Sequence, residues 1–200
     1  EKMARHSWLA PKSRLSSNRE RMLQRVRAYW VEGVLHQAVK EANQFNVGYE
    51  LTPDAVLKHI DYSDCRLPAD TDFGEVFRHL GAEVLILGTP GSGKTILLLQ
   101  LAEQLLAQAA RDDEAPIPIV LNLSSWSHKR EALHEWIVNE AAMSYQAPGR
   151  AIRRWVEDGA VVPLLDGLDE VLPEYREACV EAINEFHRSY RGVGLGVCSR

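Results

Sequence analysis

The sequence is poor in cysteine, has no long apolar run and carries no excess of positive charge. Three cysteines among 200 residues, widely spaced and with no CxxC pair, argue against a disulfide framework or a zinc site and favour a reducing, cytoplasmic setting. No apolar run approaches the ~20 residues that span a bilayer. A formal charge of −5, from 23 Lys and Arg against 28 Asp and Glu, provides no positive field that would attract nucleic acid or an anionic membrane.

The remaining composition, 46% hydrophobic and 26% charged, is that of one medium or two small globular domains. After a loosely patterned start, Ser17 and Glu20 have the S-x-x-E spacing of a capping box, which predicts a helix that begins there and ends near Lys40. Its apolar stripe contains Leu23, Val26, Trp30 and Val34. The predicted exposed face carries Arg19, Arg21, Arg25 and Arg27, either as a solvated surface or as a phosphate contact.

A connector with short helical pieces is predicted to follow, because residues 46–48 have turn composition and the stretch to about Asp72 has little periodicity. The pattern changes near Glu83. We therefore divide the chain into a helical lead-in and connector, residues 1–80, and a second unit, residues 81–200.

The second unit alternates apolar strands with helices. Strands are predicted at residues 84–87, 117–123, 161–166 and 193–198. Between them lie a strongly apolar helix over 95–110, two shorter helices that end before Gly159, and a helix opened by Pro173. The predicted buried face of this last helix is formed by Cys179, Val180, Ile183 and Phe186. Strands separated by helices indicate an α/β fold with a parallel sheet and right-handed crossovers.

The first strand leads into GTPGSGKT, residues 88–95, which matches the phosphate-loop pattern GxxxxGK[ST]. Glycines let successive backbone amides approach phosphate oxygens, and the helix that follows directs the positive end of its dipole at the same anion. Lys94 would supply a charge for the β- and γ-phosphates and Thr95 a hydroxyl for Mg²⁺. The predicted nucleotide-binding residues are Gly88, Thr89, Pro90, Gly91, Ser92, Gly93, Lys94, Thr95 and Ile96.

The third strand delivers acidic residues, in the block LLDGLDE, to the edge where open α/β sheets bind their ligands. Asp166, at the strand's end, is the predicted metal-side acid beside Thr95. Asp169 and Glu170 follow within a turn, and either can orient an attacking water. Arg200 follows the fourth strand at the same edge, from which it could reach a γ-phosphate.

Together the segments LILGTPGSGKTILLLQLAEQLL, PIPIVLNLSSW, VPLLDGLDEV and GVCSR resemble the NACHT family, a branch of the STAND class among AAA+-like P-loop NTPases, and the lead-in helix resembles that of bacterial members. The resemblance implies a three-layer α/β/α fold with sheet order 2-3-4-1. It implies that Lys94 and Thr95 are the Walker A pair, Asp166 the Walker B acid and Arg200 the sensor-1 arginine. The family's fifth strand, lid, effector and sensor domains are not in this sequence, so we expect the chain to be part of a longer protein.

The resemblance also implies a function. We expect an NLR-like switch that binds ATP or ADP with Mg²⁺, hydrolyses ATP slowly, assembles into homo-oligomers when activated and serves signal transduction, in bacteria against phage. The alternative is a motor-type AAA+ ATPase that remodels other molecules within a ring. A GTPase is disfavoured because the acidic block is DGxD rather than DxxG. A P-loop kinase is disfavoured because the sequence indicates no phosphate-acceptor pocket or lid, and a degenerate scaffold is disfavoured because Lys94, Thr95, Asp166 and Glu170 are intact.

Overall fold

A computed structural model describes residues 14–41, 49–50, 66–67 and 72–200 of the chain. Its centre is a four-stranded, all-parallel sheet of β3 (Glu83–Leu87), β4 (Ile117–Asn122), β5 (Val161–Asp166) and β6 (Leu195–Ser199). The strand order β3-β6-β5-β4 is the predicted order 2-3-4-1 counted from the other edge, so the predicted topology is confirmed. A short antiparallel pair, β1 (Tyr49–Glu50) and β2 (Arg66–Leu67), lies outside this sheet, and the turn expected at residues 46–48 is outside the described residues.

Burial along the strands explains their sequences. The first five residues of β4 and of β5 are buried, and only the last residue of each strand is partly exposed. A strand covered by helices on both faces needs a continuous apolar run rather than an alternating one. The polar residues Asn122 and Asp166 are therefore placed where the strands leave the core.

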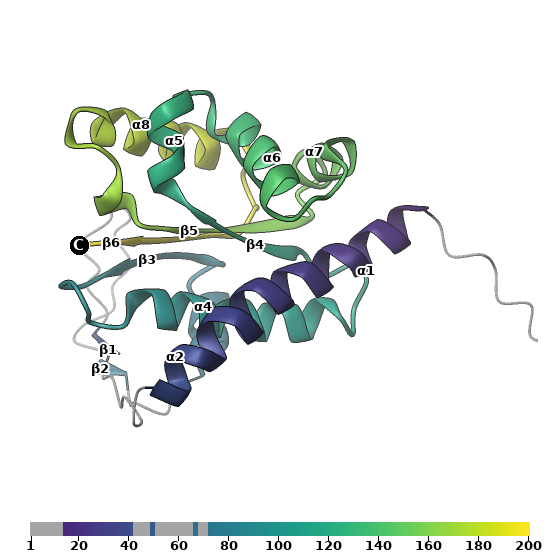
Figure 1. The fold of residues 1–200 in the computed structure, drawn as a ribbon, viewed down its shortest axis with the longest axis horizontal. Helices are drawn as coiled ribbons and strands as arrows, with labels where there is room; N and C mark the ends of the chain where they lie inside the picture. The colour runs from purple at the N-terminus through teal and green to yellow at the C-terminus, as the bar shows by residue number, and fades with distance from the viewer. Residues whose placement is uncertain (1–13, 42–48, 51–65, 68–71) are drawn as a thin grey trace, which may run out of the picture.

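Helices cover both faces of the sheet, as Figure 1 shows. On one face lie α5 (Trp126–Lys129), α6 (Leu133–Ser144), α7 (Gly149–Glu157) and α8 (Pro173–Ser189). On the other face lies α4 (Lys94–Ala109), and the long N-terminal helix crosses beside it (Figure 1). The fold is therefore the expected three-layer α/β/α arrangement.

The N-terminal helix is continuous through α1 (Arg14–Val26), a π-helical segment η1 (Arg27–Leu35) and α2 (His36–Glu41). It packs on α4 and on the edge strand β4, and its buried side chains Met22, Val26, Val31 and Leu35 belong to the same core as the sheet. This packing explains why α4 is apolar on several faces: the sheet covers one side and the N-terminal helix another.

The predicted start of this helix and its predicted exposed face are both partly wrong. Because the helix already begins at Arg14, Ser17 lies inside it and cannot cap it. Arg19, expected to be solvated, has only 9% of its surface exposed. Its Nη2 donates to the carbonyl oxygens of Ala109 (3.0 Å), Asp112 (3.1 Å) and Ala115 (2.7 Å), where α4 ends and the chain returns to β4. Burial lowers the pKa of this guanidinium, and neighbouring Asp113 opposes the effect.

A second arginine and a tryptophan attach the N-terminal helix to the helical layer on the opposite face of the sheet. Arg25 donates to the carbonyl oxygens of Tyr145 (2.6 Å) and Gln146 (2.5 Å), just after α6. Trp30 Nε1 donates to the Tyr145 hydroxyl at 2.8 Å, and this hydroxyl donates to the Val120 carbonyl of β4 at 2.5 Å. The helix is thus fixed to the edge strand and to both helical layers.

We expect Arg19→Met to lower the free energy of unfolding by about 2 kcal/mol, because it removes charge-assisted hydrogen bonds and takes the arginine donor from the buried carbonyl groups of Ala109 and Ala115. Urea denaturation followed by circular dichroism measures the change. Arg21→Met, at an exposed position of the same helix, is the matched control and should change stability by less than about 0.5 kcal/mol. Equal effects of the two substitutions would contradict an anchoring role for Arg19.

One further difference concerns α8. Of the four residues predicted to form its buried face, Cys179, Ile183 and Phe186 are buried, but Val180 is 38% exposed. A short helix, α3 (Phe73–His79), precedes β3 at the end of the lead-in and connector, where short helical pieces were expected. Its N-cap is Asp72, whose carboxylate accepts from the amides of Gly74 at 2.9 Å and Glu75 at 3.2 Å. In the described part of the chain, no helix has the length and apolar character needed to cross a membrane.

Candidate functional site

The carboxyl ends of the four parallel strands form one edge of the sheet, and each strand places a predicted or newly found site residue there. Asn122 ends β4 and lies in register with Asp166, the last residue of β5. Ser199 ends β6 in register with Leu87 of β3, and Arg200 follows it. Loops beyond this edge are where α/β sheets bind ligands.

The phosphate-loop motif forms the turn between β3 and α4. Gly93 precedes the helix with φ of 89°, a left-handed conformation that costs glycine little and other residues more. The amides at the start of α4 have no partner inside the helix and are thus available to an anion. Lys94 bends back over the loop, where its Nζ donates to the carbonyl oxygens of Gly88 at 2.7 Å and Thr89 at 3.0 Å. Ile96, the last predicted nucleotide-binding residue, has its side chain packed against the core.

Thr95, the last residue of the loop motif, contacts Asp166 at the end of β5. The Thr95 hydroxyl donates to Asp166 Oδ2 at 2.8 Å. Burial raises the pKa of the Asp166 carboxyl, with a further rise from neighbouring Glu170, whereas the hydrogen bonds from Thr95 and the Gly167 amide oppose the rise. A hydroxyl and a half-buried carboxylate are hard oxygen donors, and the negative charge is only partly compensated. Both properties fit Mg²⁺, which binds through one or two protein oxygens together with substrate phosphates.

The other two acids follow on a short 3₁₀ turn, η4 (Leu168–Glu170). Gly167 begins the turn with φ of 76°, and a Cβ at that position would lie 2.8 Å from Glu170 Oε2. Glu170 accepts a hydrogen bond from Asn122 Nδ2 at 3.0 Å. Asp169 Oδ2 lies 2.6 Å from Arg200 Nε, with side-chain exposures of 16% for Asp169 and 63% for Arg200. The aspartate is therefore fixed, whereas the arginine has room to move.

Comparison with families of known proteins shows which kind of domain carries this candidate site. The model of the NACHT domain matches residues 82–188, more than half of the chain. The chain belongs to the NACHT family. Neither the curated proteins nor the solved structures contain a match. The NACHT match includes the phosphate loop, Asp166 and the turn Leu168–Glu170, called the acidic turn below, and it identifies a nucleotide-binding P-loop NTPase domain.

Asn122, at the same edge, was not among the predicted site residues. It ends β4, and its side chain contacts Glu170 on the turn that follows β5. Its position offered a signal, because a polar residue that closes an apolar strand run is the same pattern by which Asp166 was found. Among the described residues, no group of three or more His, Cys, Asp or Glu side chains is placed to hold a metal ion.

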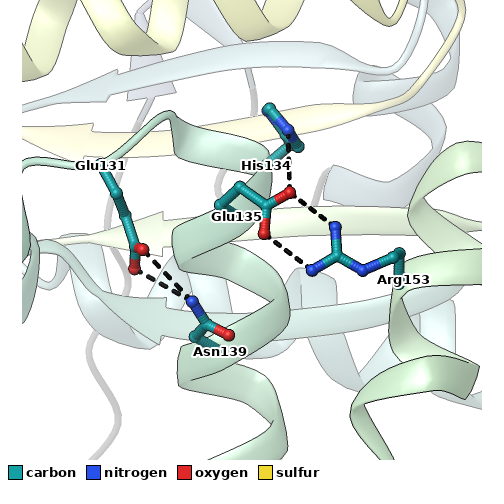
Figure 2. Close-up of polar contacts among 5 residues, drawn as sticks. All are labelled: Glu131, His134, Glu135, Asn139 and Arg153. Carbon is teal, nitrogen blue, oxygen red and sulfur yellow. Dashed lines mark hydrogen bonds and ion pairs between the residues drawn. The ribbon is translucent and has the colours of Figure 1, made fainter.

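A second set of polar contacts in the NACHT domain joins α6 to α7 and is separate from the phosphate loop. Figure 2 shows Arg153 directed at both oxygens of Glu135, at 2.6 and 2.7 Å, with His134 on the same carboxylate and Asn139 beside Glu131. Arg153 lowers the pKa of the Glu135 carboxyl. These side chains satisfy one another, as expected for a clamp between two helices.

Proposed function

We propose that this NACHT domain binds ATP and ADP with Mg²⁺ at the carboxyl edge of its sheet, hydrolyses ATP slowly and uses the nucleotide as a switch. The observation that carries the proposal is the contact of Thr95 with Asp166. It brings the last residue of the loop motif to the end of β5, where these two side chains would hold Mg²⁺ and the ion would supply positive charge to the phosphates.

Binding would exchange internal contacts for contacts with the nucleotide. Lys94 would leave the carbonyl groups of Gly88 and Thr89 for the β- and γ-phosphates, whose other oxygens would accept from amides of the loop and of the first turn of α4. Thr95 and Asp166 would hold Mg²⁺, which neutralises phosphate charge when bound. In the nucleotide-free protein, the Lys94 ammonium, the Thr95 hydroxyl and the Asp166 carboxylate already make internal hydrogen bonds, and ATP must compete with these bonds.

Hydrolysis needs a group that orients a water toward the γ-phosphate, and we propose that the acidic turn supplies it. Glu170 is held by the neutral amide of Asn122 and stays able to accept a proton or a hydrogen bond from water. Asp169 is paired with Arg200. We propose that Arg200 exchanges Asp169 for the γ-phosphate, so that its position reports whether triphosphate is bound.

The signalling role is proposed on the NACHT match. The ATP form would self-assemble into homo-oligomers through the whole protein, and partner effector and sensor domains would lie outside this chain, with defence against phage as the expected setting. The buried free thiols of Cys179 and Cys198 are in keeping with a cytoplasmic location. A motor-type ATPase is the alternative, and turnover separates the two: a motor should reach on the order of 1 s⁻¹ or more, and a switch should stay well below it.

The test is calorimetric titration of the protein with ATP, ADP and GTP in Mg²⁺, together with light scattering in ADP and in a non-hydrolysable ATP analogue. We expect micromolar-range adenine nucleotide binding, weaker GTP binding and a larger mass only with the ATP analogue. Absence of binding to every nucleotide would refute the proposed function, and equal mass in both nucleotides would refute the assembly step.

Removal of Mg²⁺ should weaken ATP binding about tenfold or more, because the negative phosphates and the negative Asp166 carboxylate then repel each other. A tenfold change in affinity corresponds to about 1.4 kcal/mol of binding free energy. Titration in excess EDTA measures the loss. In Asp166→Asn the carboxylate is absent, so EDTA should have a much smaller effect. If EDTA weakens both proteins equally, Asp166 does not hold the metal.

A further inference from the structure

Arg176 on α8 contacts the backbone of the acidic turn, and neither the motifs nor the family match assigns it a role. Its Nη2 donates to the carbonyl oxygen of Asp169 at 2.8 Å and to that of Val171 at 3.2 Å. The two carbonyl groups flank Glu170. One guanidinium therefore spans the segment that carries both candidate water-orienting acids.

The acidic turn has few other backbone restraints. Within it, the Glu170 amide donates to the Gly167 carbonyl at 2.9 Å. Gly167 before it is left-handed and Val171 after it is extended, so the segment is not held by a continuing helix. A three-residue 3₁₀ turn has weaker hydrogen-bond geometry than an α-helix. The two bonds from Arg176 are therefore a large share of what fixes the path of the backbone here.

The placement of Arg176 is unfavourable by local criteria. It lies in the first turn of α8, which begins at Pro173, and a positive charge near a helix N-terminus is opposed by the helix dipole. In addition, its Nε is buried and has no hydrogen-bond partner within the described part of the chain, and an unsatisfied buried donor costs stability. Neither the helix nor the core accounts for an arginine at this position, whereas its two contacts with the acidic turn do.

We propose that Arg176 is a positioning residue that holds the turn Leu168–Glu170 so that Glu170 and Asp169 face the phosphate loop. In the nucleotide-free protein three elements then fix the acids: Asn122 of β4 holds the Glu170 side chain, Arg200 after β6 holds the Asp169 side chain, and Arg176 of α8 holds the backbone between them. Arg176 donates to carbonyl groups and touches neither carboxylate in this arrangement. The inference rests on the proposed function, because it names what orients the groups of that same site.

The first test compares Arg176→Met and Arg176→Lys with the parent protein in ATP binding and in hydrolysis under single-turnover conditions. Small displacements of a reacting group lower rates by up to about a hundredfold. We expect Arg176→Met to lower the hydrolysis rate about 10- to 100-fold and to leave the ATP dissociation constant within about twofold. Arg176→Lys, which retains a donor, should recover part of the rate.

Arg153→Met is the matched control, because Arg153 also donates two hydrogen bonds from a partly exposed guanidinium, to Glu135 on a different pair of helices. It should change neither rate nor affinity. A parent-like hydrolysis rate in Arg176→Met would overturn the inference, as would an equal loss of rate in Arg153→Met. A loss of ATP affinity that accounts for the loss of rate would also overturn it.

Hydrogen exchange of the nucleotide-free protein tests this inference independently of the proposed function. It also remains informative if a variant is less stable than the parent. We expect faster exchange of the amides in residues 167–172 in Arg176→Met, with parent-like exchange in β4 and β5. Faster exchange confined to that turn in a protein that hydrolyses no ATP would support the positioning contact and refute the proposed function. Unchanged exchange at the turn would overturn the inference whatever the activity.

Discussion

Lys94→Ala is expected to lower the affinity of the NACHT domain for Mg²⁺–ATP about a hundredfold, the largest effect on binding of any single change in this chain. Truncating one partner of a close charge pair costs about 2–5 kcal/mol, and each 1.4 kcal/mol is a factor of ten. The reason lies in the local charge balance. Asp166, Asp169 and Glu170 surround the strand ends, and Lys94 is the cation that the loop itself brings to the phosphates.

The substitution should leave the fold intact. Among the described residues, the ammonium group donates hydrogen bonds to carbonyl groups of its own loop, and these are near solvent. Calorimetric titration measures the affinity and a thermal melt checks stability. Lys129→Ala is the matched control, since Lys129 lies 3.8 Å from Glu140 on the surface and should bind ATP as the parent does. Unchanged affinity in a folded Lys94→Ala protein would contradict nucleotide binding at this loop.

Much of the site was predictable because its residues are adjacent in sequence to apolar runs that indicate buried strands. The runs that become β3 and β5 end in the glycine of the phosphate loop and in Asp166. A parallel sheet necessarily brings such ends to one edge. The register of Asn122 with Asp166 and the contact of Thr95 with Asp166 are consequences of that topology.

The contacts that complete the site were not predictable from local patterns. Arg200 pairs with Asp169 across 31 positions of sequence, and Asn122 donates to Glu170 across 48 positions. Such pairs depend on rotamers and on the exact path of the turn after Gly167. The sequence left open which of the two acids orients water. The structure distinguishes them by partner, a cation for Asp169 and a neutral amide for Glu170.

The N-terminal helix illustrates a different limit. In the sequence, an arginine on a polar helix face looks the same whether its side chain is solvated or donates to carbonyl groups of another element. For this reason Arg19 was wrongly expected to be exposed. The S-x-x-E pattern at Ser17 also occurs inside helices, and nothing in the preceding residues forces a break. The apolar far side of α4 was the one available sign that this helix packs against the nucleotide-binding domain.

The double substitution Asp169→Asn with Glu170→Gln is expected to preserve ATP binding and to lower hydrolysis about 10²- to 10⁴-fold, the range supplied by a positioned general base. Both changes keep side-chain size, and an amide at position 170 can still face Asn122. Binding should therefore persist within about threefold, because loss of two negative charges near phosphates opposes any loss of structure. Single-turnover hydrolysis and calorimetric titration measure the two quantities separately.

The single variants then assign the role. Glu170→Gln should account for most of the loss, because Glu170 is exposed and has a neutral partner, so its carboxylate is available to water. Asp169→Asn should mainly release Arg200 and change how strongly the protein distinguishes ATP from ADP. Glu177→Gln, an exposed position on α8, is the isosteric control. Hydrolysis that survives the double change would place the water-orienting group elsewhere at this edge, and a larger loss in Asp169→Asn than in Glu170→Gln would reverse the assignment.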